Sequence, residues 1–169
     1  MDIDYFETTQ YLEWLKEKLR LNNVAGRAKN RMVKRGEVYE CNFGVGIGNE
    51  ERKKRPCVIL QNNVANQASG NVLVAPISHS FCNSPVVTPI AAQIDSTGTT
   101  ILDGNVLVGN MTCVSKARLD KYISKLSKQE MDAVDQAIIV QTGLLGKFNK
   151  LNNIIADKEQ YIEKLKNNS

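Results

Sequence analysis

The chain has 169 residues, of which 42% are hydrophobic and 24% are charged, and this is typical of one globular domain with short appendages. Its formal net charge of +4 favours polyanionic partners but is too small for a protein that coats DNA. The acidic start MDIDYFETTQ has no apolar signal segment, and no apolar run approaches the roughly 18 residues that cross a bilayer. We therefore expect a cytoplasmic protein without membrane contact.

The first predicted element is an amphipathic helix over residues 5–21. Leucines recur in it at helical spacing with charged residues between them, namely Leu12, Leu15 and Leu19 beside Trp14. The next stretch, NNVAGRAKNR over residues 22–31, has the Asn, Gly and Ala content of a linker. Residues 1–31 are thus interpreted as an N-terminal helix with its linker.

Short β-like runs divided by turn residues follow in residues 32–148. The five runs are GEVYECNF (Gly36–Phe43), RPCVILQ (Arg55–Gln61), NVLVAPIS (Asn71–Ser78), PVVTPIAAQI (Pro85–Ile94) and NVLVGNMTCV (Asn105–Val114). Because no helix separates them, they predict an antiparallel sheet or small barrel.

A helix is predicted to close this barrel. Ser127 and Glu130 have the spacing of a capping box. The apolar stripe that follows consists of Met131, Val134, Ile138 and Leu145. Strands followed by a helix indicate the α+β class.

A second peripheral helix is predicted over residues 150–169, in a C-terminal extension that begins at residue 149. Its apolar residues share one side and are Leu151, Ile154, Ile155, Ile162 and Leu165. At this length such a helix is marginal on its own. Both terminal helices need a cover for their apolar faces, which could be each other, the barrel, a second subunit or a partner protein.

The cysteines and carboxylates give no indication of a metal site. The four cysteines, Cys41, Cys57, Cys82 and Cys113, lack the short spacing of zinc or redox motifs. Three of them, Cys41, Cys57 and Cys113, lie in apolar runs, and we interpret these as small buried thiols in a reducing compartment. The acidic residues Asp95, Asp103 and Glu50 show no spacing that suggests convergence on magnesium.

The densest positive charge lies in GVGIGNEERKKRPCVILQ, where Arg52, Lys53, Lys54 and Arg55 stand directly before an apolar strand. A glycine-rich loop exposes backbone N–H groups, and lysine and arginine beside it are strong phosphate donors. Alternatively, the run is a solvated loop that prevents aggregation of the strand behind it. Arg55 differs from its neighbours because Pro56 restricts its backbone to extended geometry and fixes it at the strand entrance.

Five short motifs in this order resemble the MazF/PemK/Kid family of toxin endoribonucleases. They are RGEVY at the first strand, GNE in the loop, RPCVI and PIS in the next strands, and the ARL…EMDAVD run that leads into the helix closing the barrel. The resemblance covers residues 32–148 and excludes both terminal helices. It implies an SH3-like barrel that forms a homodimer, and a small antitoxin whose disordered tail lies across the RNA groove or dimer interface.

The resemblance also implies metal-independent cleavage of single-stranded RNA at short sequences, without a cofactor. In the family the ribose 2'-OH attacks the adjacent phosphate and leaves a 2',3'-cyclic phosphate and a 5'-OH. Because the substrate supplies its own nucleophile, the protein need only position RNA, stabilise charge and move protons.

Site residues follow from matching motif positions. Arg55 matches the catalytic arginine that holds the scissile phosphate and assists proton transfer to the leaving oxygen. Ser78 matches the hydroxyl residue that donates to the same phosphate. The loop residues Gly48, Asn49 and Glu50 match the segment that closes over RNA, while the neighbouring Arg52, Lys53 and Lys54 would bind flanking phosphates.

Three features leave alternatives open. Asn110 is expected to contact RNA, but many family members carry Gln and Arg where this chain has Asn110 and Thr112, which keeps open a catalytically silent barrel that binds nucleic acid or a partner protein. The only histidine, His79, would join Ser78 at the site only if the strand ends between them, and otherwise has a surface role. Tyr39 and Phe43 fit base stacking, but core packing is favoured for both.

Overall fold

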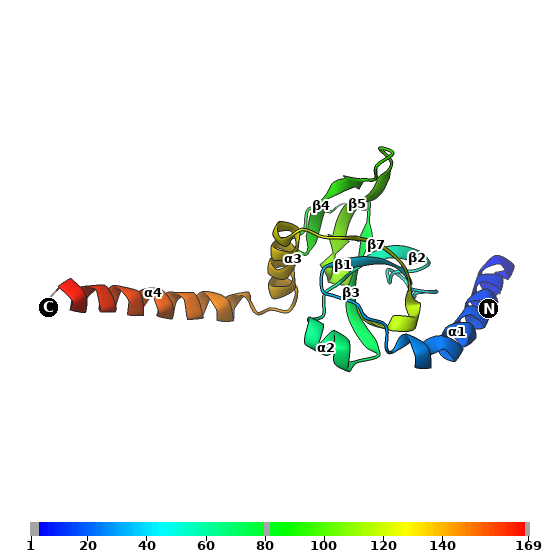
Figure 1. Cartoon of the computed structure of the whole chain (residues 1–169), viewed down its shortest axis with the longest axis horizontal. Helices are drawn as coiled ribbons and strands as arrows, with labels where there is room; N and C mark the ends of the chain where they lie inside the picture. Colours follow the sequence, from blue (N-terminus) through cyan, green and yellow to red (C-terminus); the bar gives the residue numbers. More distant parts are fainter. Residues whose placement is uncertain (1–3, 80–81, 168–169) are drawn as a thin grey trace.

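The computed structural model describes residues 4–79 and 82–167, and its centre is one curled antiparallel sheet (Figure 1). The strands are β1 (Glu37–Asn42), β2 (Lys54–Ile59), β3 (Asn71–Ser78), β4 (Val87–Ile94), β5 (Thr100–Leu107), β6 (Thr112–Ser115) and β7 (Leu119–Lys125). Their order is β4-β5-β3-β2-β1-β7, with β6 paired to β3 outside this path. The predicted α+β class is confirmed, and the sheet forms an open half-barrel.

The run predicted as one strand over residues 105–114 is divided in two, so that prediction was wrong. Strand β5 pairs with the end of β3, where Ser78 lies opposite Asn105, whereas β6 pairs with the beginning of β3, where Asn71 lies opposite Ser115. The short 3-10 helix η1 (Val108–Asn110) makes the turn between them. Strand β7 and the short helix α2 (Asn63–Ala68) were not predicted.

Helix α1 (Tyr5–Ala28) continues through most of the stretch that was predicted to be a linker. Its Leu21 is buried, and the helix packs on the 3-10 helix η2 (Lys116–Arg118). This tertiary packing overrides the weak helix propensity of the Asn and Gly residues in the stretch. The helix therefore packs on the half-barrel through Leu21, whereas Leu12, Leu15 and Leu19 of the predicted apolar face stay exposed.

The C-terminal helices also differ from the prediction. Helix α3 (Lys128–Gln141) begins with the expected capping box, in which Ser127 Oγ accepts from the Glu130 amide at 3.2 Å and Glu130 accepts from the Ser127 amide at 2.7 Å. Helix α3 ends before Gly143, whose left-handed φ of +70° separates Leu145 from the rest of the predicted apolar stripe. Helix α4 (Leu145–Asn167) therefore begins five residues before Lys150, and residues 168 and 169 of the predicted helix lie outside the described residues.

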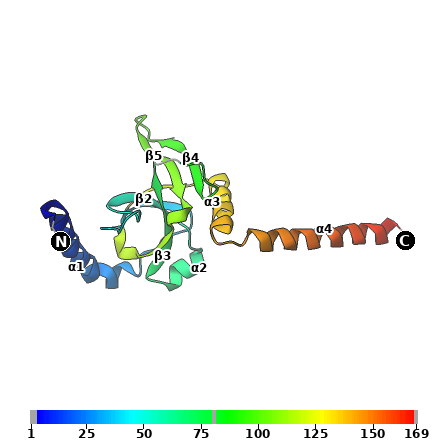
Figure 2. The same ribbon diagram turned by 180° about the vertical axis from the view of Figure 1, so that it is seen from behind.

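Helices α1 and α4 extend to opposite sides of the sheet, as both views show (Figures 1 and 2). None of the described side chains of α4 is buried, so its apolar face stays exposed. No helix in the ranges 4–79 and 82–167 is both long enough and apolar enough to cross a membrane.

Alternate residues of the strands supply two buried clusters. Val38 of β1 packs in the cluster covered by α3, whereas its neighbour Tyr39 packs in the cluster on the other side. Cys41 and Cys57 are buried as predicted, but Cys113 is exposed, so its interpretation as a buried thiol was wrong; Cys82 is exposed as well. Cys113 is exposed because Val114 takes the core-facing position on the short strand β6.

Tyr39 is predicted to titrate later than an exposed tyrosine. Burial and donation of its hydroxyl to Glu37 Oε2 at 2.9 Å raise the pKa of Tyr39 to about 12. Since this pKa is raised, the stabilisation by the protonated hydroxyl is present below pH 10 and is lost as the pH rises toward 12. Phenolate absorbance should show one late transition that Tyr39→Phe removes, with circular dichroism monitoring the fold. Titration of every tyrosine near pH 10 in the folded protein would contradict this.

Candidate active site

The loop between β1 and β2 carries the glycine-rich motif and is closed at its root by backbone hydrogen bonds. The Phe43 amide donates to the Lys53 carbonyl at 2.9 Å, and the Lys53 amide donates to the Gly44 carbonyl at 2.7 Å. Both Gly44 (φ +84°) and Lys53 (φ +67°) have left-handed backbones, which close the loop tightly. Within the loop, Glu50 accepts from the Ile47 amide at 3.0 Å, so its carboxylate fixes the loop tip.

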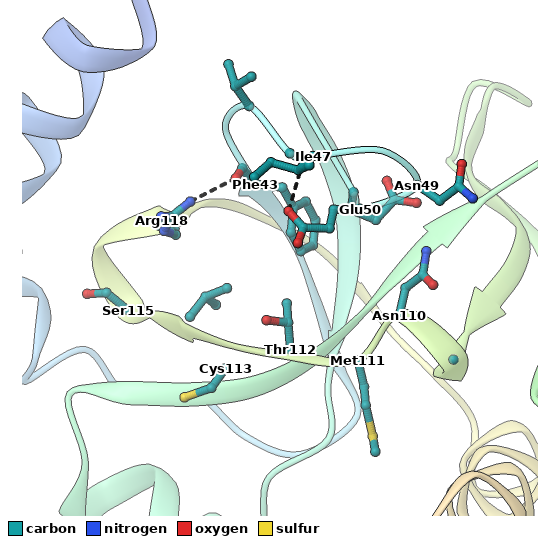
Figure 3. Close-up of a pocket in the computed structure, with 15 residues that line it drawn as sticks. Phe43, Ile47, Asn49, Glu50, Asn110, Met111, Thr112, Cys113, Ser115 and Arg118 are labelled. Atoms are coloured by element: carbon teal, nitrogen blue, oxygen red, sulfur yellow. Dashed lines mark hydrogen bonds between the residues drawn. The ribbon is translucent and has the colours of Figure 1, made fainter. Parts of the chain in front are cut away.

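The larger of two pockets beside this loop has a volume of about 810 Å³ (Figure 3). Asn49 and Glu50 line it from the loop, and Asn110 lines it from the turn before β6. Its other walls include Phe43, Thr112 and Arg118. The structure thus brings together Asn49, Glu50 and Asn110, which the sequence had predicted as RNA contacts.

The smaller pocket, of about 300 Å³, lies where β2 begins and β3 ends. Arg55 and Ser78 both line it, because the register that pairs Cys57 with Pro76 places them at the same end of the two strands. Strand β3 ends at Ser78, so His79 is free of strand alternation and lines the pocket too. His79 Nε2 lies 2.6 Å from Asp103 Oδ1, and its side chain is 82% exposed.

Arg55 is held by a residue that the sequence analysis had not singled out, Glu51. Arg55 Nε lies 2.7 Å from Glu51 Oε2, and the Glu51 side chain is only 13% exposed. This contact is an ion pair without the alignment of a hydrogen bond, since the N–H is directed to the Arg52 carbonyl at 3.4 Å. Glu51 also lines the larger pocket, so this pair joins the two pockets. The spacing of four residues within a charged run was the available signal.

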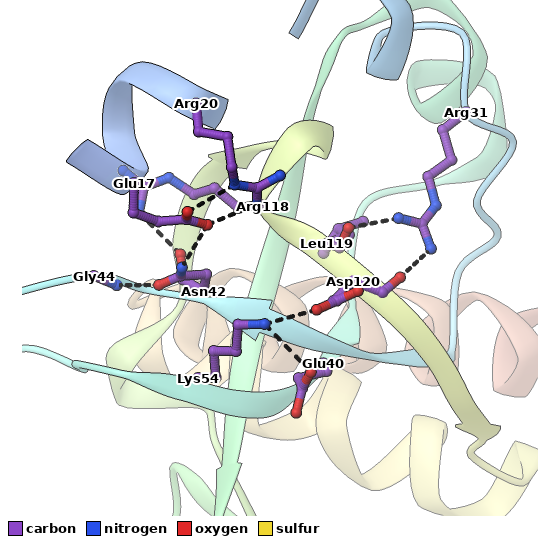
Figure 4. Close-up of polar contacts among 10 residues, drawn as sticks. All are labelled: Glu17, Arg20, Arg31, Glu40, Asn42, Gly44, Lys54, Arg118, Leu119 and Asp120. Atoms are coloured by element: carbon purple, nitrogen blue, oxygen red, sulfur yellow. Dashed lines mark hydrogen bonds and ion pairs between the residues drawn. The ribbon is translucent and has the colours of Figure 1, made fainter. Parts of the chain in front are cut away.

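The other cations of the run have different surroundings, and those of Lys54 are drawn in Figure 4. Lys54 Nζ lies 2.7 Å from Asp120 and 3.9 Å from Glu40, and the hydrogen bond to Asp120 raises the pKa of Lys54 while lowering the pKa of Asp120. Arg52 donates to the Gly48 carbonyl at 2.8 Å. Lys53 is exposed. Lys54 is therefore already paired on the protein, whereas Lys53 faces solvent.

Among the described residues, no three His, Cys, Asp or Glu side chains come together as ligands for a metal ion.

Comparison with known proteins identifies the fold and the family. A crystal structure of MazF from Deinococcus radiodurans superimposes with a TM-score of 0.58 at 17% identity and covers 67% of this chain and 98% of that one. A mycobacterial endoribonuclease solved in complex with its cognate antitoxin gives a TM-score of 0.56 at 22% identity, over 66% of this chain and 96% of that one. The half-barrel is therefore the fold of these structures.

Sequence similarity identifies the family of the chain. Endoribonuclease EndoA of Bacillus subtilis (strain 168) is 28% identical over 114 residues, which cover 68% of this chain and 97% of the relative. The family model for the PemK-like, MazF-like toxin of type II toxin-antitoxin system matches residues 34–142. The chain belongs to this toxin family, as its motifs predicted. Helices α1 and α4 lie outside the matched region.

Replacing Lys54 should change the titration of Asp120. In Lys54→Met the pKa of Asp120 should rise toward that of an exposed aspartate, because the Lys54 hydrogen bond that lowers it is gone. Because the pKa of Asp120 is depressed in the folded protein, its ionised carboxylate stabilises the fold at pH values above the ordinary pKa of aspartate. This contribution is lost as the pH falls through the depressed pKa. Carboxyl-carbon NMR titration measures the shift, with Lys121→Met as the matched control. An unchanged Asp120 pKa in Lys54→Met would show that the pair does not form in solution.

Proposed function

We propose that the chain is a metal-independent endoribonuclease that cleaves single-stranded RNA at short sequences and acts as the toxin of its toxin-antitoxin pair. The observation that carries the proposal is the pocket shared by Arg55 and Ser78. Membership of the toxin family and similarity to a relative named as an endoribonuclease support it. The pocket offers what a substrate-supplied nucleophile requires, namely a fixed cation and a hydroxyl.

In the proposed reaction the 2'-hydroxyl of a ribose loses its proton as its oxygen forms a bond to the adjacent phosphorus, and the bond from phosphorus to the 5'-oxygen breaks as that oxygen gains a proton. The products are a 2',3'-cyclic phosphate and a 5'-OH. The Arg55 guanidinium stabilises the charge that accumulates on the phosphorane and assists proton transfer to the leaving oxygen, while Ser78 donates a hydrogen bond to the same phosphate. Glu51 orients the guanidinium through its ion pair.

The larger pocket recognises the RNA bases. Its Asn49 and Asn110 side chains offer donors and acceptors, and Glu50 contributes through the loop whose turn Gly48 makes with its left-handed backbone. The exposed Lys53, with Arg52 and Lys54 beside it, binds flanking phosphates. His79 lies at the rim of the smaller pocket and contacts RNA from there.

We place the protein in the cytoplasm as a homodimer that a cognate antitoxin neutralises. One structural neighbour was solved in complex with its cognate antitoxin, which supports a protein partner of this kind. A division of the chain at residues 31 and 148 separates the barrel domain, which would carry these functions, from its N- and C-terminal helical extensions. Molar mass in solution before and after deletion of α4 measures whether that helix contributes to the dimer.

Purified protein should cut a long RNA in the presence of EDTA and leave ends that carry a cyclic phosphate. Arg55→Ala should lower the rate by about 10²- to 10³-fold, the cost of removing one preorganised donor to transition-state charge. Arg55→Lys should recover little activity because an ammonium cannot bind the phosphate in a bidentate manner. Lys128→Ala is the matched control, since this 88% exposed side chain lies outside both pockets. RNA that binds but stays intact would favour the catalytically silent barrel.

The Ser78 hydroxyl has a separate test. Ser78→Ala should lower kcat by about 10- to 100-fold, the range for a lost hydrogen bond to a charged group. Ser78→Thr keeps the hydroxyl and should retain most of the activity. Single-turnover cleavage of a short RNA measures the chemical step directly. Equal rates for Ser78→Ala and the unmodified protein would exclude this residue from the reaction.

A further inference from the structure

Helix α1 touches the root of the loop that lines the larger pocket, although it lies outside the region shared with the family. The contact is made by Trp14 at Gly44. A Cβ atom added to Gly44 would lie 2.3 Å from the nearest Trp14 ring atom, so the indole lies directly against the glycine backbone. Only a residue without a side chain allows this approach, and Gly44 is also the position where the loop needs its left-handed backbone.

Arg118 joins the same indole to the end of β1. Its guanidinium carbon lies 5.0 Å from the centre of the Trp14 ring, in a cation–π contact. Its Nη1 donates to the Phe43 carbonyl (Figure 3) and to the Asn42 carbonyl, each at 3.0 Å. Arg118 also lines the larger pocket. One side chain therefore connects helix α1, the loop root and the pocket wall.

A second contact from α1 reaches the same root through Glu17 (Figure 4). Asn42 Nδ2 donates to Glu17 Oε1 at 3.4 Å, and Asn42 Oδ1 accepts from the Gly44 amide at 3.1 Å. Arg20 donates to both Glu17 oxygens at 2.7 Å, and this hydrogen bonding lowers the pKa of Glu17. The carboxylate thus stays ionised and in place at neutral pH.

We propose that α1 positions the β1–β2 loop for single-stranded RNA, with Trp14 and Arg118 as positioning residues for recognition in the larger pocket. The RNA part rests on the proposed function. Asn49 and Glu50 follow the fixed root by a few residues, so a shift at Gly44 moves them relative to Asn110 across the pocket. When the root is not fixed, RNA binding costs the additional entropy of ordering the loop. Arg55 and Ser78 lie on β2 and β3 in the other pocket, so α1 reaches the chemical step only through Glu51 of the loop, and that step depends less on α1 than recognition does.

Trp14→Ala tests the proposal by two independent readouts. Amide hydrogen exchange of residues 44–53 should become at least about tenfold faster, because the root loses its fixed contacts. With a short RNA substrate, KM should rise by about tenfold while kcat changes by less than about threefold. Leu12→Ala is the matched control, since that side chain is 62% exposed on the same helix. Trp14→Phe keeps an aromatic face toward Arg118 and should restore most of both properties.

Two results would overturn the proposal: loop exchange in Trp14→Ala equal to that in Leu12→Ala, or a KM that stays unchanged while kcat falls. If the unmodified protein cleaves no RNA, the proposed function fails, but loop exchange still decides whether α1 positions the loop. Should Trp14→Ala not fold, as judged by circular dichroism, Trp14→Leu, which keeps apolar volume but removes the aromatic face toward Arg118, is compared with Leu12→Ala by the same two criteria.

Gly44→Ala approaches the contact from the loop side. Alone, it forces the new methyl group against the indole, so loop exchange should accelerate. In the Trp14→Ala background that clash is gone, and the added acceleration should be smaller than in the single variant. The two effects are therefore expected to be non-additive, as for residues in direct contact. Independent, multiplicative effects would contradict a direct contact between Trp14 and the loop root.

Discussion

The candidate active site depends on one constraint, the fixed position of the Arg55 guanidinium at the entrance of β2. Pro56 restricts the backbone beside it, and the β2–β3 register brings it to the end of β3, where Ser78 lies. The ion pair with the largely buried Glu51 then limits how far the long side chain can move. A cation held in this way meets phosphate charge without a large cost of reorganisation.

The four basic residues of the run have different partners because the fold places each one differently. Lys54 pairs with Asp120 of β7 and Arg55 pairs with Glu51, whereas Arg52 donates to a loop carbonyl and, like Lys53, has no described ionic partner. The charge therefore has little freedom to bind phosphate indiscriminately, in keeping with a net charge of only +4. Counting cations in the sequence would overstate the electrostatic attraction of this loop for RNA.

Local patterns predicted the features that depend on neighbouring residues. The capping box of Ser127 and Glu130 holds, because it is fixed within a few residues. The pairing of β3 with β5 at one end and β6 at the other depends on contacts between distant segments, so the break at η1 left no periodic signal. For the same reason Arg55 and Ser78 could be proposed from motifs, whereas Glu51, Arg118 and Trp14 needed the structure.

The attachment of α1 to the half-barrel has its own physical cause in the buried Lys116. Its ammonium donates to the Asn66 carbonyl at 2.6 Å and to the Lys29 carbonyl at 3.2 Å, near the C-terminal ends of α2 and α1. Burial lowers the pKa of Lys116, and these partially negative helix ends compensate the desolvated charge. Lys116 and Arg118 belong to the same 3-10 helix, so one three-residue segment holds the end of α1 and delivers the guanidinium that packs on Trp14. The accessory helix and the loop root are therefore fixed to the same point of the sheet, which makes α1 a part of the site's framework.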